Sequence, residues 1–456
     1  MASVSAEGVT GSLIRTGTPT DDERTRVRAF FEESLAAQAQ SPERNRVVPL
    51  NVRREAFSNF DGRTVSGGKP GRDWKHDYAH VAATVPWTSG GASPLGALAE
   101  PLLPRDAVLA DIVMDAFVVR IHGSDGDAKG VRLRHVRDLQ SEDDVILRDN
   151  SFGRAVHWRG DKFASLAAAL IQDGPLIYVP PRVRAERPVL IRANSALYGS
   201  TFPYTLIVLD EGAEATVVED TQGPGFFCGI VEAIVGDGAR LNYIAVQRAG
   251  TDSTVLMNRG AVCGKDASCN WYLAELGGGL SRSLVSTRLE GRGATTDITA
   301  FFFNDGDQHV DLSSLVEHAV GDSASRTIVK SAAKERGQGR YLGNIRIDEH
   351  ANGSDAALRD DALLLSKYAH IDSVPALEIA SNDVKAFHGA TIGSIDEEEL
   401  FYAQSRGIER NDAERMIALG FFEPALSTFP IAAVRDTLRT VLSEKAGAAN
   451  VMAETA

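Results

Sequence analysis

The stretch VGDGARLNYIAVQRAGTDSTVLMNRGAVCGKDASC, residues 235–269, contains one complete unit of the repeat that decides the fold. Short runs rich in Val, Ile, Leu and Tyr alternate with turns, and the opening turn VGDGARL returns at the end as CGKDASC. Runs of this composition, bounded by Gly and Asp, are typical of β-strands joined by tight turns.

The same turn occurs five times in the middle of the chain. The five copies are LDEGAEA (209–215), VGDGARL (235–241), CGKDASC (263–269), EGRGATT (290–296) and VGDSASR (320–326). The alanines that they share are Ala213, Ala239, Ala267, Ala294 and Ala324, which are 26, 28, 27 and 30 residues apart. A second Gly-containing turn lies about midway between successive copies, for example RAGTD (248–252).

A repeat of this length predicts a stacked β architecture, because one rung cannot bury its own apolar face. A propeller blade needs about 40 residues, so a solenoid is favoured. We therefore predict a mainly β chain with a right-handed parallel β-helix as its core. A small Ala suits a corner at which neighbouring rungs approach closely.

Three regions follow from the change in pattern along the chain. We expect a helical and mixed N-terminal domain over 1–175, the β-helix core over 176–393 and a C-terminal helical domain over 394–456. The first helix is signalled by Thr20 as N-cap with Glu23 three residues later, and DKFASLAAALIQDG (161–174) predicts another helix.

The C-terminal domain shows three helix signals. Ser394 followed by Glu397 predicts a capping box, and Gly407 is placed to end that helix. The second helix is expected from about 411 to Gly420, and the third over about 428–445.

Composition restricts the classes of function. The net charge of −14 provides no basic excess to neutralise phosphates, which argues against nucleic-acid binding. No apolar run is long enough for a signal peptide or a membrane span. The three cysteines, Cys228, Cys263 and Cys269, form no CxxC pair and are expected to be buried thiols in a reducing compartment. We expect a cytoplasmic protein that does not bind membranes.

Common catalytic motifs are missing from the sequence. It contains no GxxxxGK[ST], GxSxG or HExxH, so ATP hydrolysis, serine hydrolysis and zinc proteolysis have no support. The Gly-rich GGKPG (67–71) has no strand before it and is interpreted as a plain loop. Asp360 and Asp361 could suggest a glycan-cleaving site, but adjacent strand residues point to opposite faces.

Three histidines in the late rungs could bind iron, because neutral imidazole is a good ligand for this metal. They are His350, His370 and His388. Each of them, taken singly, is more typical of a structural residue than of a ligand.

The segment HGATIGSIDEEELFYAQSRGIERNDAERMIALGFFEPAL (388–426) resembles the C-terminal signature of the SufB/SufD family, HGATxGxIDEExLFYLxSRGIxxxxAxxLxxxGF. The resemblance extends back through SRTIVKSAAKERGQGRYLGNIRI (325–347) and DALLLSKYAHIDSVPALEI (361–379), and more weakly to WKHDY (74–78). Because no cysteine follows Cys269 and Gly389 stands where the SufB branch has an acid, the chain looks closest to the SufD branch.

The resemblance implies a non-enzymatic scaffold for iron–sulfur cluster assembly. It implies pairing with a SufB-like chain through the β-helix ends, docking of the SufC-like ATPase on the C-terminal helices, and a transient cluster at the scaffold interface with none tightly bound to the isolated chain. A family histidine that faces a partner cysteine corresponds to His388. The expected docking residues are Leu400, Phe401, Tyr402, Arg406, Met416, Phe421 and Phe422, although the apolar members are also those that a helical core would use.

Two alternatives remain at this point. One is a SufB-type scaffold that acts as a homodimer, as the isolated chain could also do, and the other is a β-helix carbohydrate-active enzyme.

Overall fold

The computed structural model describes residues 21–39, 48–62, 101–115, 118–122, 130–139, 152–171, 173–194 and 200–447. The predicted cap at Thr20, the loop GGKPG and the segment WKHDY lie outside these residues. No helix among the described residues is long and apolar enough to cross a membrane.

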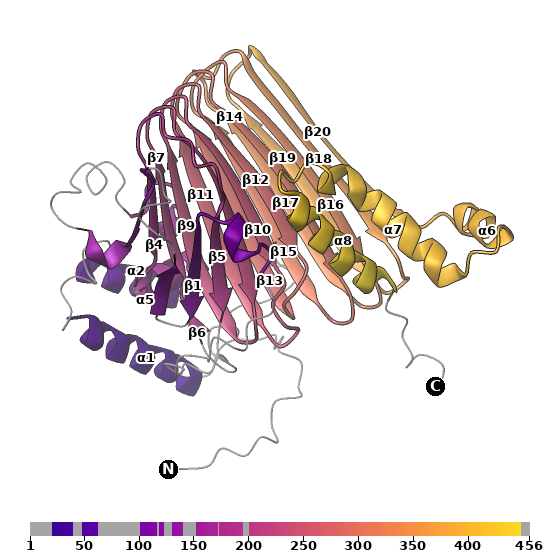
Figure 1. Cartoon of the computed structure of the whole chain (residues 1–456), viewed down its shortest axis with the longest axis horizontal. Coiled ribbons are helices and arrows are strands. Elements are labelled where there is room, and N and C mark those ends of the chain that lie inside the picture. The colour runs from indigo at the N-terminus through magenta and orange to yellow at the C-terminus, as the bar shows by residue number, and fades with distance from the viewer. Residues whose placement is uncertain are drawn as a thin grey trace.

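Two ten-stranded sheets, called A and B below, form the body of the molecule (Figure 1). Sheet A consists, in spatial order, of β2 (Val118–His122), β1 (Ala110–Asp115), β5 (Val189–Asn194), β8 (Glu214–Gln222), β10 (Arg240–Gln247), β12 (Ser268–Glu275), β14 (Thr295–Asn304), β16 (Ala324–Ala333), β18 (Ser354–Leu364) and β20 (Val384–Ser394). Sheet B consists of β19 (His370–Ile379), β17 (Gln338–Ile347), β15 (His309–His318), β13 (Leu280–Leu289), β11 (Thr254–Cys263), β9 (Phe226–Val235), β7 (Tyr204–Leu209), β4 (Pro175–Val179) and β3 (Arg132–His135), and β6 (Ser200–Thr201) pairs with β9.

From β7 onward successive strands alternate between the two sheets, so each rung contributes one strand to each sheet. From β4 and β5 onward every pairing is parallel, whereas β1–β2 and β3–β4 are antiparallel. Alternate side chains point into the space between the sheets, and the largest apolar cluster fills this space. The predicted parallel β-solenoid, with helices at both ends of the chain, is confirmed.

The repeated turns form a stacked corner along one side of the solenoid. In each turn one residue has a positive φ, for example Gly238 at 66° and Asp266 at 55°. In four of the five turns its backbone N–H donates to a carbonyl of the next turn, as from Gly238 to Lys265 at 2.7 Å and from Asp266 to Arg292 at 3.0 Å. The turns are therefore joined to one another by the same kind of bond that joins the strands.

The residue after each positive-φ position points into the core. Ala213, Ala239, Ala267 and Ala294 occupy it and are fully buried. The predicted fifth member, Ala324, was wrong by one residue. Asp322 has the positive φ of 56°, so Ser323 takes the buried place and Ala324 begins β16.

N-terminal helices cover the outer face of the early strands of sheet B. They are α1 (Asp21–Ala39), α2 (Leu50–Gly62) and α5 (Lys162–Leu170), and short 3₁₀ turns lie at Arg105–Ala107, Val136–Asp138 and Trp158–Gly160. Asp161 caps α5, as its side chain accepts hydrogen bonds from the N–H groups of Phe163 and Ala164. This Asp also pairs with Arg282 on β13, which ties the helix to the sheet.

C-terminal helices cover the outer face of sheet A instead. They are α7 (Arg410–Leu426) and α8 (Ala432–Gly447), and α6 (Glu397–Ser405) precedes them. Phe422 on α7 stacks near Phe301 and Phe303 of β14, with ring centroids 5.6 and 5.9 Å away. Figure 1 shows α7 and α8 against the sheet and α6 projecting beyond it.

Three predicted helix boundaries in this region were wrong, and the first is the start of α8, which lies at Ala432 and not near 428. The side chain that caps α6 is Asp396, which accepts from Glu398 N–H at 2.8 Å, because pairing with β18 keeps Ser394 in strand β20. Helix α7 continues through Gly420 and Pro424 to Leu426. A glycine ends a helix when it takes a positive φ. Gly407 does so at 84°, whereas Gly420 is not among the residues with positive φ.

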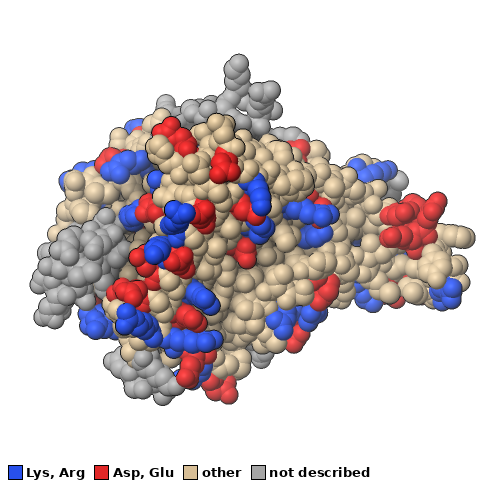
Figure 2. Space-filling model, turned by 90° about the horizontal axis from the view of Figure 1, so that it is seen from above, with Lys and Arg blue, Asp and Glu red and all other residues tan. Residues whose placement is uncertain are grey.

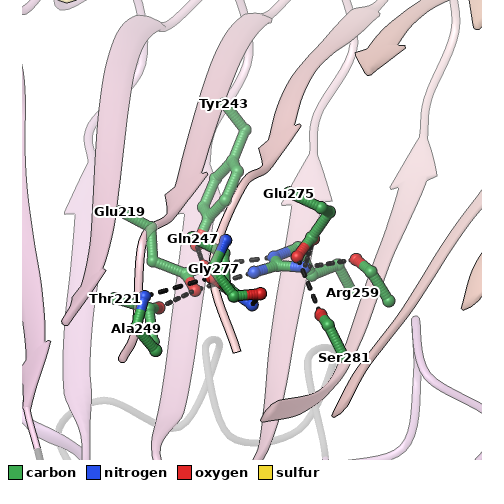
Figure 3. A network of polar contacts seen from close by, with 10 residues as sticks. Glu219, Thr221, Tyr243, Gln247, Ala249, Arg259, Glu275, Gly277 and Ser281 are labelled. Atoms are coloured by element: carbon green, nitrogen blue, oxygen red, sulfur yellow. Dashed lines mark hydrogen bonds and ion pairs between the residues drawn. The ribbon is translucent and has the colours of Figure 1, made fainter. Parts of the chain in front are cut away.

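Charged side chains also lie inside the solenoid (Figure 3). The guanidinium of Arg259 on β11 is fully buried and donates to both oxygens of Glu219 on β8, at 2.8 and 3.1 Å. The Tyr243 hydroxyl also donates to Glu219. Burial alone would raise the pKa of Glu219, but Arg259 and the Tyr243 hydroxyl hold this pKa below its ordinary value.

A second carboxyl lies on the other side of the same guanidinium. Glu275 is 3.8 Å from Arg259 and accepts from the Ser281 hydroxyl at 3.1 Å. Burial raises the pKa of Glu275, and Arg259 opposes that rise. At this position the buried cation therefore offsets the charge of Glu219 and opposes the rise in the pKa of Glu275.

Replacing Arg259 with Met should lower the free energy of unfolding by about 3–5 kcal/mol, because the Glu219 charge would stay buried without a partner. The melting temperature of the purified chain measures the effect. The double variant Glu219→Gln/Arg259→Met should be more stable than the single variant. Arg182→Ala, which removes an exposed pair with Glu211, is the control and should melt like the wild type.

His318 gives the interior a sensitivity to acid. Its ring lies between the hydroxyls of Ser323 and Ser325, at 2.8 and 2.9 Å. Burial lowers the pKa of His318 to about 4, and Asp355 opposes this only in part. The neutral ring therefore fits the folded state and the charged ring does not.

Stability should fall as the pH drops from about 6.5 to 4, because the unfolded chain binds this proton first. The loss assigned to His318 is about 3 kcal/mol at pH 4. Melting curves at several pH values should show a flatter profile for His318→Asn than for the wild type. The exposed His350→Asn should reproduce the wild-type profile, and an equally steep profile for His318→Asn would contradict the assignment.

Candidate functional site

The solenoid ends in an open rung made of β19 and β20. Each of these strands is the last in its sheet. Among the described residues, no strand pairs with the outer edge of either one. Their outward backbone N–H and C=O groups therefore lack the partner that every earlier rung supplies.

His388 lies in the middle of this terminal rung. The register of β20 on β18 places it beside Leu358, a fully buried residue of the interior. Because side chains alternate along a strand, His388 shares the inward face with Ala386, which packs against the core. With no further rung above it, the imidazole is exposed, and no hydrogen bond or ion pair to the ring occurs within the described part of the chain.

The other two candidate histidines are placed differently. His350 lies in an exposed turn, 3.1 Å from Glu349. His370 begins β19 and contacts Asp372 at 3.0 Å. Neither shares the inward face of β20 with His388.

Exposed apolar side chains also lie on the terminal rung. Phe387 is 60% exposed and Ile392 50%, and on β19 Val374 and Ile379 are 44% and 43% exposed. None of these four residues is among the site residues expected from the sequence. The sequence does contain a signal for them: apolar residues occur on both faces of β19 and β20, although one face of a solenoid strand normally meets water.

The cysteines are buried, as expected. Cys228, Cys263 and Cys269 are all free and buried. Burial raises the pKa of the Cys228 and Cys269 thiols. Neutral, enclosed thiols are poor ligands, because metals bind the thiolate.

The terminal rung therefore offers few ligands of its own. Among the described residues, no group of three or more His, Cys, Asp and Glu side chains is arranged to hold one metal ion. A single exposed imidazole binds iron as part of a larger ligand set. Asp360 and Asp361 point to opposite faces of β18, as predicted, so they do not form a carboxylate pair.

The seven residues expected to dock an ATPase divide into two groups. Leu400 and Phe422 are each 1% exposed and belong to the cores beneath the helices, and Phe421 is half-buried. Phe401, Tyr402 and Met416 are 72%, 62% and 58% exposed. Arg406 is exposed as well, and its guanidinium lies over the Tyr402 ring at 5.2 Å.

The first turn of helix α6 also carries negative charge. Glu397, Glu398 and Glu399 follow one another there, and Arg410 pairs with Glu397 at 2.9 Å. Figure 2 shows acidic side chains gathered near the projecting end of the molecule. Exposed aromatic residues beside a ring of charges are typical of a protein-binding surface.

Comparison with known proteins places this geometry in a family. Residues 190–421 match the model described as "SUF system FeS cluster assembly, SufBD core domain". The chain is 28% identical over 330 residues to the iron-sulfur cluster assembly protein SufB of Bacillus subtilis (strain 168), covering 71% of this chain and 70% of the relative.

Two further relatives agree. The iron-sulfur cluster assembly protein SufD of the same Bacillus strain is 31% identical over 291 residues, with 62% and 67% coverage. A SufBD family protein of Staphylococcus epidermidis is 27% identical over 328 residues, with 70% coverage of each chain. The matches to SufB and SufD are similar in strength and establish what the two have in common: the chain belongs to the SufB/SufD family of iron–sulfur cluster assembly proteins.

Proposed function

We propose that the chain is a SufD-like scaffold, not an enzyme, which pairs with a SufB-like subunit and a SufC-like ATPase to support cluster assembly and iron acquisition. The observation that carries the proposal is an exposed, inward-facing His388 on an open terminal rung in a chain whose cysteines are all buried. Free thiols fit a reducing compartment, so the proposed place of action is the cytoplasm.

The ligand set supports a scaffold that works with a second chain. Iron–sulfur clusters in proteins are held mainly by cysteine thiolates. His388 alone supplies one neutral nitrogen, and the buried thiols supply nothing to the terminal rung. The missing ligands would come from the SufB-like partner, and the cluster would exist only while the two chains are in contact.

The open edges of β19 and β20 support the same partner. A second chain that adds strands there would satisfy the outward backbone groups and cover Phe387, Val374, Ile379 and Ile392. Strand addition would also bring a partner residue within reach of His388. An isolated chain could use the same edges to form a homodimer.

The C-terminal helices support docking of the ATPase. Phe401 and Tyr402 on α6 and Met416 on α7 are exposed, and Arg406 lies over the Tyr402 ring. Leu400 and Phe422 hold the helices from below and would act only through their stability. ATP-driven movement of the docked subunit could then open or close the scaffold contact.

Replacing His388 with Ala should leave the three-subunit complex intact and lower its iron and acid-labile sulfide at least threefold after anaerobic reconstitution. The reason is that the terminal rung loses its only exposed inward imidazole. The matched control is His370→Ala on the neighbouring strand, which should retain wild-type iron. Wild-type cluster content in His388→Ala would refute the ligand role. A stable chromophore on the isolated wild-type chain would instead favour a SufB-type scaffold.

Replacing Phe401 and Tyr402 together with Glu should weaken binding of the SufC-like ATPase at least tenfold, because two exposed aromatic anchors would become charged. Titration calorimetry with the purified ATPase measures the effect. Ala433→Glu, an exposed position on α8, is the control and should bind normally. Normal affinity in the double variant would mean that the ATPase docks elsewhere.

A further inference from the structure

Asp360 is a carboxylate inside the solenoid, one strand below the terminal rung. It is completely buried, and its neighbours at alternate positions on β18, Leu358 and Ala362, belong to the inner core. In the parallel register Asp360 lies beside Ala390 of β20, and Leu358 lies beside His388. Asp360 and His388 therefore share the inward face of adjacent strands, two residues apart along the strand direction.

No hydrogen bond satisfies this carboxylate among the described residues. Both of its oxygens are buried and lack a donor in hydrogen-bonding geometry. The buried Ser373 hydroxyl on the opposite strand β19 lies near enough to lower the pKa of Asp360, but it is not in hydrogen-bonding geometry with the carboxylate. Buried polar groups without a hydrogen bond are rare in a folded protein, because burying them costs free energy of folding. This cost is far larger for a carboxylate than for a hydroxyl.

The adjacent residue Asp361 shows what a structural carboxylate of this strand looks like. It points outward and accepts from Lys330 Nζ at 2.7 Å, Thr391 Oγ1 at 2.6 Å and Arg359 Nε at 3.1 Å. Burial alone would raise the pKa of Asp361, but these three donors bring it below its ordinary value. Asp360 and Asp361 are adjacent in sequence, but Asp361 has a complete set of hydrogen-bond donors and Asp360 has none among the described residues.

The surroundings of Asp360 disfavour its charge. Burial raises the pKa of Asp360 to about 6, with a further rise from Asp361, while Ser373 and Lys330 oppose it. Tyr341 of β17 faces the same interior, and Asp360 contributes to the raised pKa of its phenol, which burial dominates. None of these residues neutralises the carboxylate as Arg259 neutralises Glu219.

We propose that Asp360 is a second ligand of this chain for ferrous iron, held beneath His388 at the open end of the solenoid. The inference rests on the proposed assembly function and adds a named oxygen donor to it. A carboxylate and an imidazole together suit Fe²⁺. Ideal sheet spacings put the two Cα positions about 8 Å apart, a separation that one ion can bridge between Asp and His side chains.

Access to this position is short. In the terminal rung next to Asp360, Ala390 is exposed and Ser373 is half-buried. The carboxylate is therefore one strand away from the open end of the solenoid. An ion bound at His388 would lie one strand above the carboxylate and two residues along the strand direction, and the carboxylate would lose its proton as the ion binds.

The experiment compares Asp360→Asn with Asp361→Asn in two measurements. The first is the melting temperature of the metal-free chain. Asp360→Asn should raise it by about 1–3 °C, since it removes an uncompensated buried charge, whereas Asp361→Asn should lower it. The second is the iron content of the three-subunit complex after anaerobic reconstitution with Fe²⁺ and sulfide, which should fall at least threefold in Asp360→Asn and stay at the wild-type level in Asp361→Asn.

A variant that is more stable but poorer in iron supports the ligand role, because a purely structural residue would not separate the two measurements. A lower melting temperature for Asp360→Asn, or wild-type iron in its complex, overturns it. His388→Ala, measured in parallel, separates this inference from the assembly function. If His388→Ala loses iron and Asp360→Asn keeps it, only the role of Asp360 fails. If both keep it, the assembly site itself is wrong.

Discussion

Backbone hydrogen bonding between rungs is the constraint on which the rest of the structure depends. Every strand from β8 to β18 has a parallel neighbour on each side, and the corner turns are joined in the same way, as from Gly238 to Lys265. A solenoid therefore satisfies its polar backbone everywhere except at its ends. At the N-terminal end, antiparallel pairings of β1 with β2 and β3 with β4 complete the sheets. At the C-terminal end β19 and β20 stay open, and His388 lies on that end.

The interior carries charge in two contrasting ways. Near the middle, Arg259 is surrounded by Glu219 and Glu275, so desolvation is offset by mutual attraction and by hydroxyl donors (Figure 3). Near the open end, Asp360 has no comparable partner among the described residues. Balanced charges are what a stable core requires, whereas an unbalanced charge is expected where stability has been given up for function. The contrast is local, because both sites lie in the same kind of parallel β-structure.

Much of the fold could be predicted from the sequence, because the repeated turn has a strong local requirement. The positive-φ residue and the small side chain after it recur at a nearly constant spacing, and this identified the solenoid. The prediction is wrong where the small residue itself changes, because the corner residue after Asp322 is Ser323 instead of Ala324. Helix ends also depended on context, as Gly420 shows.

His388 was found through the family signature, and its exposure follows from the missing rung above it. The buried Asp360 was noticed only as one of a pair, because the lack of donors around it depends on side chains from neighbouring rungs that are distant in sequence.

The stacked architecture also fixes the distance between two surfaces of the molecule. Helices α7 and α8 are attached to the outer face of sheet A around β14 and β16, while the open end lies at β20. Each rung adds about 4.8 Å along the stack. The number of rungs between these points fixes the distance between the helical surface and the terminal face in units of one strand. A change in that number would move the two surfaces relative to each other without altering the residues of either. Evolution can therefore change the distance between the two surfaces through the number of rungs, separately from the chemistry at either surface.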